Sequence, residues 1–556
     1  MTKDINRKAP CARIGAFLFI GSFGLYLLTL APCVAFWDSG ELIAGAFGLG
    51  VPHQPGYPLY CMTAKAFSLI PLGNVAYRAN LLSASSFSLA TFILYHILLE
   101  MTSELRPWVK AATSASLSLL AGTLSITWPQ AEAAEVYGLN AVFVTLLIYL
   151  IVIARRGRLS FSRYMPLSGF VFGLGVVDHQ SIVLYAPTLL LTWLATPGPA
   201  MRERVGPMLT ALFFMALGLS VYIYLPVRAW AGVAPNIGHP ETLSGFLWVQ
   251  KWGEYIRQAP GALESLRHVM GGVPGLDKRL LIMGAISGVI AWRVARRDWR
   301  MYAPLLVYLT VYTLGVSALT LGNERDIRFG LEEKFFAPTA IMVAVFAGGG
   351  AGMLAYGRLK TLASAVVAMA LMAFIPYQII HNWRACDRSD NYIAFDYAQN
   401  ALKSAGQGGV LYTWGDNGAF PLWYTHMVER YRDDVTVIHA PLMTYAWYLA
   451  DAQESLGKRV DFMPPYFLGE NVNRVNMAVS PIMSVAYDYS ARKFLDLEDA
   501  GLTQRGVVYF EGKVPPGDPG PTLVFRGVDD PAVFKGPIEE NILAIYEYQK
   551  RSATTR

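Results

Sequence analysis

Two pairs of acidic residues are each spaced i and i+3 beside a long apolar run. Asp38 and Glu41 lie in the segment Phe-Trp-Asp-Ser-Gly-Glu after the first apolar run, and Glu132 and Glu135 precede a later one. Residues at this spacing share one face of a helix. A carboxylate at a bilayer edge, shielded by aromatic neighbours, can have a raised pKa and act as a general base. The alternative for the first pair is a capping box, in which Asp38 caps the helix and Glu41 closes its first turn.

The second acidic pair is predicted to line a polar cavity, because carboxylates beside membrane spans are costly unless they face one. A solvated start of a helix is the alternative for Glu132 and Glu135. Two histidines fall in similar places. His53 lies at 51–60 in a turn stiffened by three prolines and a glycine, and His179 follows Asp178 between two apolar runs,. Both histidines are candidate pocket residues, with loop stiffening and a solvated hairpin tip as the alternatives.

Two arginines at the ends of apolar runs are candidates for binding a phosphate. Arg228 ends the segment Tyr-Leu-Pro-Val-Arg, and Arg325 lies in Asn-Glu-Arg-Asp between two runs. A guanidinium can bind phosphate through paired hydrogen bonds, although either residue could instead reach the lipid interface as a snorkelling side chain.

These candidates belong to a chain that is too apolar to fold around one water-soluble core. It has 556 residues, of which 54% are hydrophobic and 15% charged, and a net charge of +6. The basic residues fall mostly in short segments between apolar runs, which is typical of membrane topology signals and argues against nucleic-acid binding. The four cysteines are far apart, so neither a disulfide framework nor a zinc site is predicted,. Nucleotide-binding and metalloprotease motifs are absent from the sequence.

The hydropathy pattern predicts a polytopic α-helical membrane protein of about 11 spans, the first of them a retained signal anchor. The pair flanking Asp178 could instead form one re-entrant hairpin. The apolar runs lie near residues 14–33, 79–99, 111–128, 139–154, 164–177, 180–196, 207–226, 279–294, 302–320, 338–357 and 361–380.

The short basic loops all fall on the side of the N-terminus, which makes that side cytoplasmic. The longer loops, at 34–78, 227–278 and 321–337, face the other side, and an odd number of spans also places the C-terminal part there. The chemistry is therefore expected to be extracytoplasmic.

From about residue 381 the composition changes to short alternating elements. Strands are predicted at 409–414 and 435–439, and helices at 420–430 and 444–456,. We therefore expect two parts, a transmembrane catalytic domain at 1–380 and an extracytoplasmic soluble α/β domain at 381–556.

Several segments together resemble the membrane-embedded protein O-mannosyltransferases, a family once known only as a domain of unknown function. They are the segment around Asp38, His53-Gln-Pro-Gly-Tyr-Pro-Leu, Asn80-Leu-Leu-Ser-Ala, Glu135-Val-Tyr-Gly-Leu-Asn, Tyr224-Leu-Pro-Val-Arg-Ala, Glu324-Arg-Asp and Gly415-Asp-Asn-Gly-Ala-Phe-Pro-Leu-Trp-Tyr. The chain departs from the family pattern at Gln54, where proline is usual, and at Asp178, where a neutral residue is expected.

The resemblance implies a GT-C fold and an inverting glycosyltransferase whose donor is a sugar on polyprenyl or dolichyl phosphate. The implied reaction transfers mannose to Ser or Thr hydroxyls of secreted or envelope proteins. In GT-C enzymes an acidic residue of the first outer loop is the catalytic base, and that position matches Asp38, with Glu41 next. The remaining candidates, His53, Glu132, Glu135, His179, Arg228 and Arg325, would bind substrate.

Other functions stay open from the sequence. A transporter or flippase could use the same buried acids and arginines, the acceptor could be a glycan or lipid, and the chain could be a noncatalytic envelope subunit. No metal site is predicted, although a divalent cation between carboxylates and phosphate remains an alternative. The expected location is a bacterial inner membrane with the active site facing the periplasm, with an endoplasmic reticulum and a lumenal site as the alternative.

Overall fold

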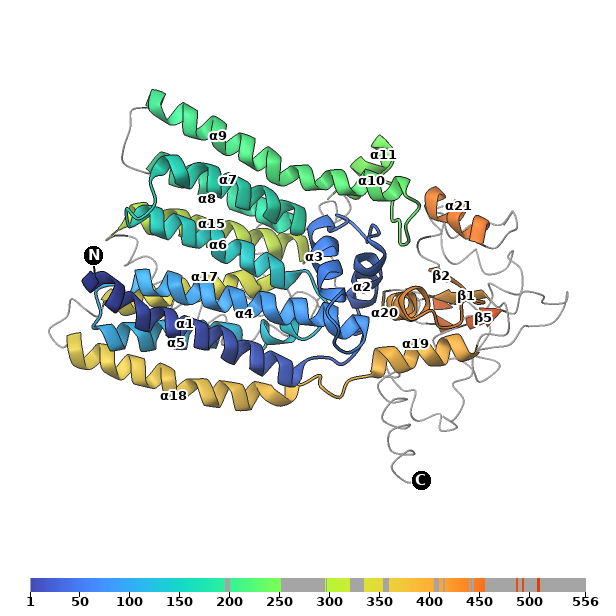
Figure 1. The fold of residues 1–556 in the computed structure, drawn as a ribbon, viewed down its shortest axis with the longest axis horizontal. Helices are drawn as coiled ribbons and strands as arrows, with labels where there is room; N and C mark the ends of the chain where they lie inside the picture. Colours follow the sequence, from blue (N-terminus) through green and yellow to red (C-terminus); the bar gives the residue numbers. More distant parts are fainter. Residues whose placement is uncertain are drawn as a thin grey trace, which may run out of the picture.

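A bundle of long helices forms most of the described part of the chain, with a smaller α/β region at one end (Figure 1). The computed structural model describes residues 2–195, 201–251, 296, 298–320, 335–353, 360–404, 410–413, 416–439, 442, 445–455, 487–488, 493–494 and 508–510. The bundle helices are α1 (Thr2–Thr29), α4 (Val75–Met101), α5 (Pro107–Gly122), α6 (Tyr137–Arg155), α7 (Phe161–Asp178), α8 (Ala186–Ala195), α9 (Met201–Leu219), α15 (Trp299–Thr320), α17 (Ala337–Met353) and α18 (Lys360–Cys386).

The predicted apolar runs fall on these helices, except that the run at 279–294 lies outside the described residues. Within the described part of the chain, five helices are long and apolar enough to cross a membrane. They are Cys11–Thr29, Val75–Met101, Tyr137–Arg155, Arg202–Trp230 and Thr361–Cys386. The protein is therefore an integral membrane protein, and the total of about 11 spans stays a prediction.

The bundle exposes apolar side chains on its outer helices and buries them at its centre. On α9, Phe213 is 65% exposed, and on α18, Leu362 is 64% exposed. Helix α4 is buried along most of its length between α1, α5 and α6. Exposed apolar surface of this kind is stable only against lipid.

Helices α7 and α9 approach closely because glycines line their contact. A Cβ atom at Gly169 would lie 2.2 Å from the carbonyl oxygen of Ala211, and one at Gly173 would lie 2.4 Å from that of Met215. Small residues four apart let two helix backbones meet in this way within a membrane.

The end of the bundle that carries the N-terminus also carries a cluster of basic residues. The Arg156 side chain donates to the Glu100 carbonyl oxygen at 2.8 Å, and the Arg158 guanidinium pairs with the Glu100 carboxylate. This clustering agrees with the predicted topology, in which the short basic loops share one side.

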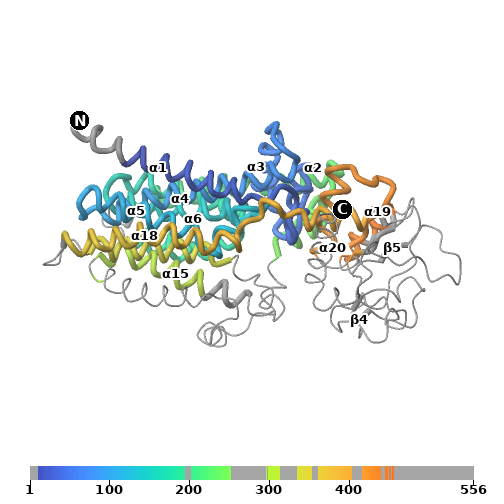
Figure 2. The backbone as a smooth tube through the Cα atoms, turned by 90° about the horizontal axis from the view of Figure 1, so that it is seen from below, coloured from blue at the N-terminus to red at the C-terminus, as the bar shows by residue number. Residues whose placement is uncertain are grey.

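The opposite end carries the short elements that connect the bundle helices on that side. They are α2 (Ser39–Gly48), α3 (Pro58–Ser68), η1 (Trp128–Ala131), η2 (Gln180–Tyr185), η3 (Ser220–Ile223), α10 (Tyr224–Trp230) and α11 (Leu243–Val249). Figure 2 shows α2 and α3 between the bundle and α19–α20. The acidic residues and histidines selected from the sequence therefore lie at this end.

The α/β region, here called the C-terminal region, packs against α2. Its helices are α19 (Ile393–Ser404), α20 (Asp416–Trp423), a π-helix (Tyr424–Val428) and α21 (Ala446–Ser455). Strand β1 (Val410–Thr413) pairs parallel to β2 (Thr436–His439) and antiparallel to β5 (Val508–Phe510), and β3 (Tyr487–Asp488) pairs with β4 (Lys493–Phe494). Elements β1, β2 and α21 lie where they were predicted, whereas the helix predicted at 420–430 is the second half of α20 followed by the π-helix. Most residues after 455 lie outside the described part.

Candidate active site

Asp38 lies immediately before α2, at the junction of the first span and the loop. Its carboxylate makes no cap hydrogen bond with α2, and the residue is half-buried. The predicted alternative of a capping box is therefore wrong. The helix is instead started by backbone bonding, with the Asp38 carbonyl accepting from the Leu42 N–H at 2.9 Å.

The residue before Asp38 has a left-handed backbone. Trp37 has φ of 62°, which costs an ordinary side chain about 1–2 kcal/mol,. Its N–H donates to Asn417 Oδ1 of α20 at 2.7 Å. A contact from the C-terminal region thus holds the turn that leads into Asp38.

Glu41 is buried and binds His53, rather than sharing an open face with Asp38. Its Oε1 accepts from the His53 backbone N–H at 2.7 Å, and its Oε2 lies 2.5 Å from His53 Nδ1. The Glu41 side chain is 1% exposed and that of His53 is 30% exposed. Glu41 therefore fixes both the backbone and the ring of His53.

This contact determines the charge of His53. Burial opposes protonation, but the charge of Glu41 and its hydrogen bond outweigh burial and raise the pKa of His53 to about 10,. The carboxylates of Asp38 and Asp416 act in the same direction. His53 is thus an imidazolium at neutral pH, and it provides positive charge beside Asp38.

Aromatic rings connect His53 to His179. Tyr57 Oη lies 3.4 Å from His53 Nε2, and the Tyr57 ring stacks on His179 with centroids 6.4 Å apart. The centroid of the Tyr137 ring lies 5.6 Å from that of the His179 ring. Burial, with the nearby charge of His53, lowers the pKa of His179 to about 4, so this second ring is neutral. The structure therefore brings the two predicted histidines into one cluster of rings with Tyr57 and Tyr137.

The residue beside His179 does not orient it. His179 Nδ1 lies 2.7 Å from Ser181 Oγ, whereas the Asp178 carboxylate is fully buried and has no hydrogen-bond partner among the described residues. Ser181, and not the neighbouring Asp178, therefore fixes the His179 ring, and the alternative of a solvated hairpin tip is wrong because both residues are buried.

The second acidic pair is buried, so the alternative of a solvated helix start is wrong; a cavity beside Glu132 and Glu135 stays a prediction, and the two residues face different neighbours. Glu132 lies 3.6 Å from Arg388 Nε at the start of the C-terminal region. Burial raises the pKa of Glu132 to about 8, and the nearby Thr29 hydroxyl and the charge of Arg388 offset part of this rise. Glu135 lies within electrostatic range of Tyr137, as does Asp38. Glu135 and Asp38 thus share Tyr137 as a neighbour, whereas Glu132 is paired with Arg388.

Arg228 lies at the other end of α2 from Asp38. Its Nε donates to the Leu49 carbonyl at 2.9 Å and its Nη2 to that of Gly48 at 3.2 Å. A ten-residue helix is about 15 Å long,. Arg228 is thus separated from Asp38 by the length of α2, and Arg325 lies outside the described residues.

The C-terminal region meets α2 without space between their backbones. A Cβ atom at Gly40 would lie 2.0 Å from the Phe420 carbonyl oxygen. Asp416 and Asn417, which precede Phe420 on α20, therefore lie at the start of α2. The sequence selected neither residue as a site candidate, although both stand in the Gly-Asp-Asn-Gly motif.

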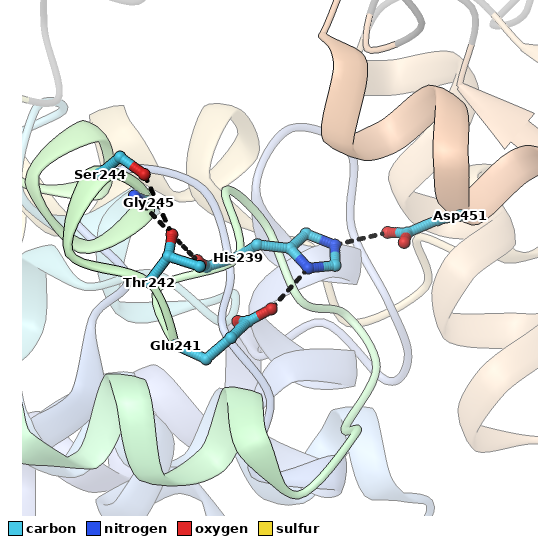
Figure 3. Close-up of polar contacts among 6 residues, drawn as sticks. All are labelled: His239, Glu241, Thr242, Ser244, Gly245 and Asp451. Atoms are coloured by element: carbon cyan, nitrogen blue, oxygen red, sulfur yellow. Dashed lines mark hydrogen bonds and ion pairs between the residues drawn. The ribbon is translucent and has the colours of Figure 1, made fainter.

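A second contact joins the C-terminal region to the loop before α11 (Figure 3). His239 Nδ1 lies 2.8 Å from Glu241 and its Nε2 lies 3.0 Å from Asp451 of α21. Burial opposes a charge on His239, but the hydrogen bonds to Asp451 and Glu241 raise its pKa. Trp248 and Trp447 pack beside this contact with rings 5.7 Å apart.

The arrangement brings together a carboxylate, a cation and three aromatic rings: Asp38, His53, and the rings of Tyr57, Tyr137 and His179. These groups suit the transfer of a group from an anionic leaving group to a hydroxyl. In the part of the chain that the structure describes, no group of three or more His, Cys, Asp or Glu side chains could hold a metal ion.

Comparisons with known proteins identify relatives of this chain. The family model described as the N-terminal domain of protein O-mannosyl-transferase TMEM260 matches residues 38–198, and TMEM260-associated domain 2 matches residues 394–462. The protein O-mannosyl-transferase TMEM260 of Mus musculus is 29% identical over 458 residues, covering 78% of this chain and 63% of the relative. That of Dictyostelium discoideum is 23% identical over 510 residues, covering 82% and 60%. The chain thus spans less than two thirds of the length of these relatives.

Among solved structures, the crystal structure of ArnT from Cupriavidus metallidurans bound to undecaprenyl phosphate is similar with a TM-score of 0.50 and 12% identity. The match covers 79% of this chain and 88% of the other. This likeness confirms the membrane GT-C fold that the sequence resemblance implies.

Proposed function

We propose that this relative of the membrane-embedded protein O-mannosyltransferases is a glycosyltransferase that moves mannose from a polyprenyl phosphate to a protein Ser or Thr hydroxyl. The observation that carries the proposal is the carboxylate of Asp38. It lies at the start of α2 without a capping role, beside an imidazolium held by a buried carboxylate. The names of the relatives and the lipid phosphate bound to the structural neighbour support the donor and acceptor classes.

The reaction needs one displacement at the anomeric carbon of the donor. Asp38 accepts the proton of the acceptor hydroxyl while the hydroxyl oxygen forms a bond to that carbon. The bond from the carbon to the phosphate oxygen breaks, and the lipid phosphate leaves with the electron pair. Attack from the face opposite the phosphate inverts the anomeric centre. A base positioned in this way contributes about a hundredfold to ten-thousandfold in rate.

His53 is the positive charge that the departing phosphate requires. It is protonated at neutral pH, its ring is fixed by Glu41, and 30% of its side chain is exposed. Charge-assisted hydrogen bonds of this type stabilise an anion that forms during the reaction. Arg228 is about 15 Å away along α2, so in this proposal it holds the end of that helix. A phosphate role for Arg325 remains the sequence-based prediction.

We place the reaction on the extracytoplasmic side. The first-loop residues lie at the end of the bundle opposite the basic loops, and cytoplasmic loops are the ones enriched in Lys and Arg. A bacterial inner membrane with a periplasmic site is our proposed location.

The test measures transfer of radiolabelled mannose from synthetic polyprenyl phosphate mannose to envelope proteins by the purified chain in detergent. Asp38→Asn should lower the rate at least about a hundredfold. Glu104→Gln is the matched control, because Glu104 is an exposed acid at the opposite end of the bundle. An active Asp38→Asn protein would contradict the assignment of the base. If the wild-type chain transfers no sugar from any polyprenyl phosphate, transport becomes the favoured function.

A further inference from the structure

The turn that carries Asp38 is held by a residue far along the chain. The Trp37 N–H donates to Asn417 Oδ1 at 2.7 Å, across 380 residues of sequence. Trp37 has a left-handed backbone, with φ of 62°. A residue with a bulky side chain keeps this conformation when surrounding contacts over-determine it. The Asn417 side chain makes such a contact at the residue adjacent to Asp38.

The helix that carries Asn417 is fixed against α2. The Phe420 carbonyl occupies the place that a Cβ atom of Gly40 would take. Phe420, Ala419 and Trp423 also pack with Ile237 from the loop before α11. Helix α20 therefore holds the first loop in a defined position.

A second attachment keeps the C-terminal region in the same orientation. His239 joins Glu241 of its own loop to Asp451 of α21 (Figure 3). The two contacts lie on different elements of the C-terminal region, α20 and α21. This restricts both sliding and rotation of the region over α2.

We infer that Asn417 is a positioning residue for the base Asp38, and that the C-terminal region thereby completes the active site. This inference rests on the proposed function. Asn417 touches the backbone before Asp38 and acts on the reaction through it. Asp416, which contributes to the charge around His53, lies next to Asn417 on the same helix. The C-terminal region is thus part of the catalytic unit, in addition to any contact with an acceptor.

The experiment compares the full-length chain with Asn417→Ala, Asn417→Asp and the control Asn391→Ala. Asn391 lies in the same region and accepts from the Ile393 N–H at 3.1 Å, so its loss removes an equivalent bond away from α2. In the mannose-transfer assay, Asn417→Ala should lower kcat by about 10-fold to 100-fold, with the donor KM changed less than about twofold. Asn417→Asp keeps the accepting oxygen and should restore most of kcat, whereas Asn391→Ala should keep wild-type kcat.

Hydrogen exchange of the segment containing Trp37 provides the readout that does not depend on activity. In Asn417→Ala the Trp37 amide should lose its protection, while it should remain protected in Asn417→Asp and in Asn391→Ala. Unchanged protection and unchanged kcat in Asn417→Ala would overturn the inference. A kcat that stays low in Asn417→Asp while the Trp37 amide is protected would also overturn it. If the wild-type chain transfers no sugar, the proposed function fails, and the exchange measurement still decides whether Asn417 positions the turn.

Discussion

Replacing Glu41 by glutamine should lower the pKa of His53, which in the wild type is about 10 and keeps the ring cationic at neutral pH. The wild-type carboxylate lies 2.5 Å from His53 Nδ1 and also accepts from the backbone N–H. Glutamine keeps the size and one accepting oxygen but removes the charge. Burial lowers the pKa of His53, and the charge of Glu41 that outweighs burial is absent in the variant.

The size of the effect follows from the pKa of His53, which is raised from 6.5 to about 10. At about 1.4 kcal/mol per unit, this rise corresponds to about 5 kcal/mol of preference for the imidazolium. Asp38 and Asp416 retain their part in the variant. We therefore expect the His53 pKa to fall below 7, so that the ring is neutral at physiological pH.

The assay is the pH dependence of kcat/KM for the lipid-phosphate donor between about pH 5 and 9. The wild-type profile should show no loss from deprotonation of His53 in this range. Glu41→Gln should be severely impaired at pH 8 and should recover as the pH falls below the new pKa. Glu100→Gln, which changes another buried carboxylate at the opposite end of the bundle, should keep the wild-type profile.

Stability gives an independent check with a defined sign. Because the folded pKa of His53 is raised, its contribution to stability is complete below about pH 6.5 and is lost as the pH rises through about 10,. Glu41→Gln should flatten this dependence of stability on pH in thermal unfolding measurements.

A Glu41→Gln protein that is as active as the wild type at pH 8 would refute the role of the imidazolium.

Three further outcomes are expected. Gly40→Ala should lower both activity and the unfolding temperature, because its new Cβ meets the backbone of α20 at 2.0 Å, whereas Gly24→Ala, with nothing within 4 Å, should be neutral or stabilising by up to about 1 kcal/mol,. The raised pKa of the Glu132 carboxyl makes the stability of the wild type decline between about pH 4.5 and 8,. The unfolding temperature of Glu132→Gln should therefore rise relative to that of the wild type as the pH increases from 5 to 9. A difference in unfolding temperature that does not change with pH would contradict this. The raised pKa of His239 means that its support of α21 is complete below about pH 6.5 and lost at higher pH; cleavage by proteinase K should therefore increase with pH in wild type and lose that dependence in Asp451→Asn,.

The sequence could predict where the site lies, because hydropathy and basic loops decide which end of each span a polar residue occupies. Asp38, Glu41, His53 and His179 all fall at the same end of the bundle in the structure, and the resemblance to the family is confirmed by the comparisons. The roles of these residues in catalysis stay predictions.

The arrangement within the site could not be derived from spacing. Two acids at i and i+3 look equivalent on a helical face, yet Glu41 turns inward to His53 while Asp38 stays half-exposed. Adjacency in sequence also did not indicate the partner of His179, which bonds to Ser181, while the Asp178 carboxylate is buried with no hydrogen-bond partner among the described residues. The contribution of Asn417 depends on a contact across 380 residues, for which a local pattern carries no signal.

The hydrogen bond between the first loop and α20 also has a consequence for biosynthesis. The ribosome synthesises the first loop long before Asn417. The turn before Asp38 therefore lacks its hydrogen-bond partner until the bundle helices that precede α20 have been synthesised. Nascent chains that stop before α20 should integrate into the membrane, but the turn before Asp38 would lack the contact that positions it. Under the proposed function, the active site would then be completed in one late step after the spans have assembled, and chains still being synthesised would transfer no sugar.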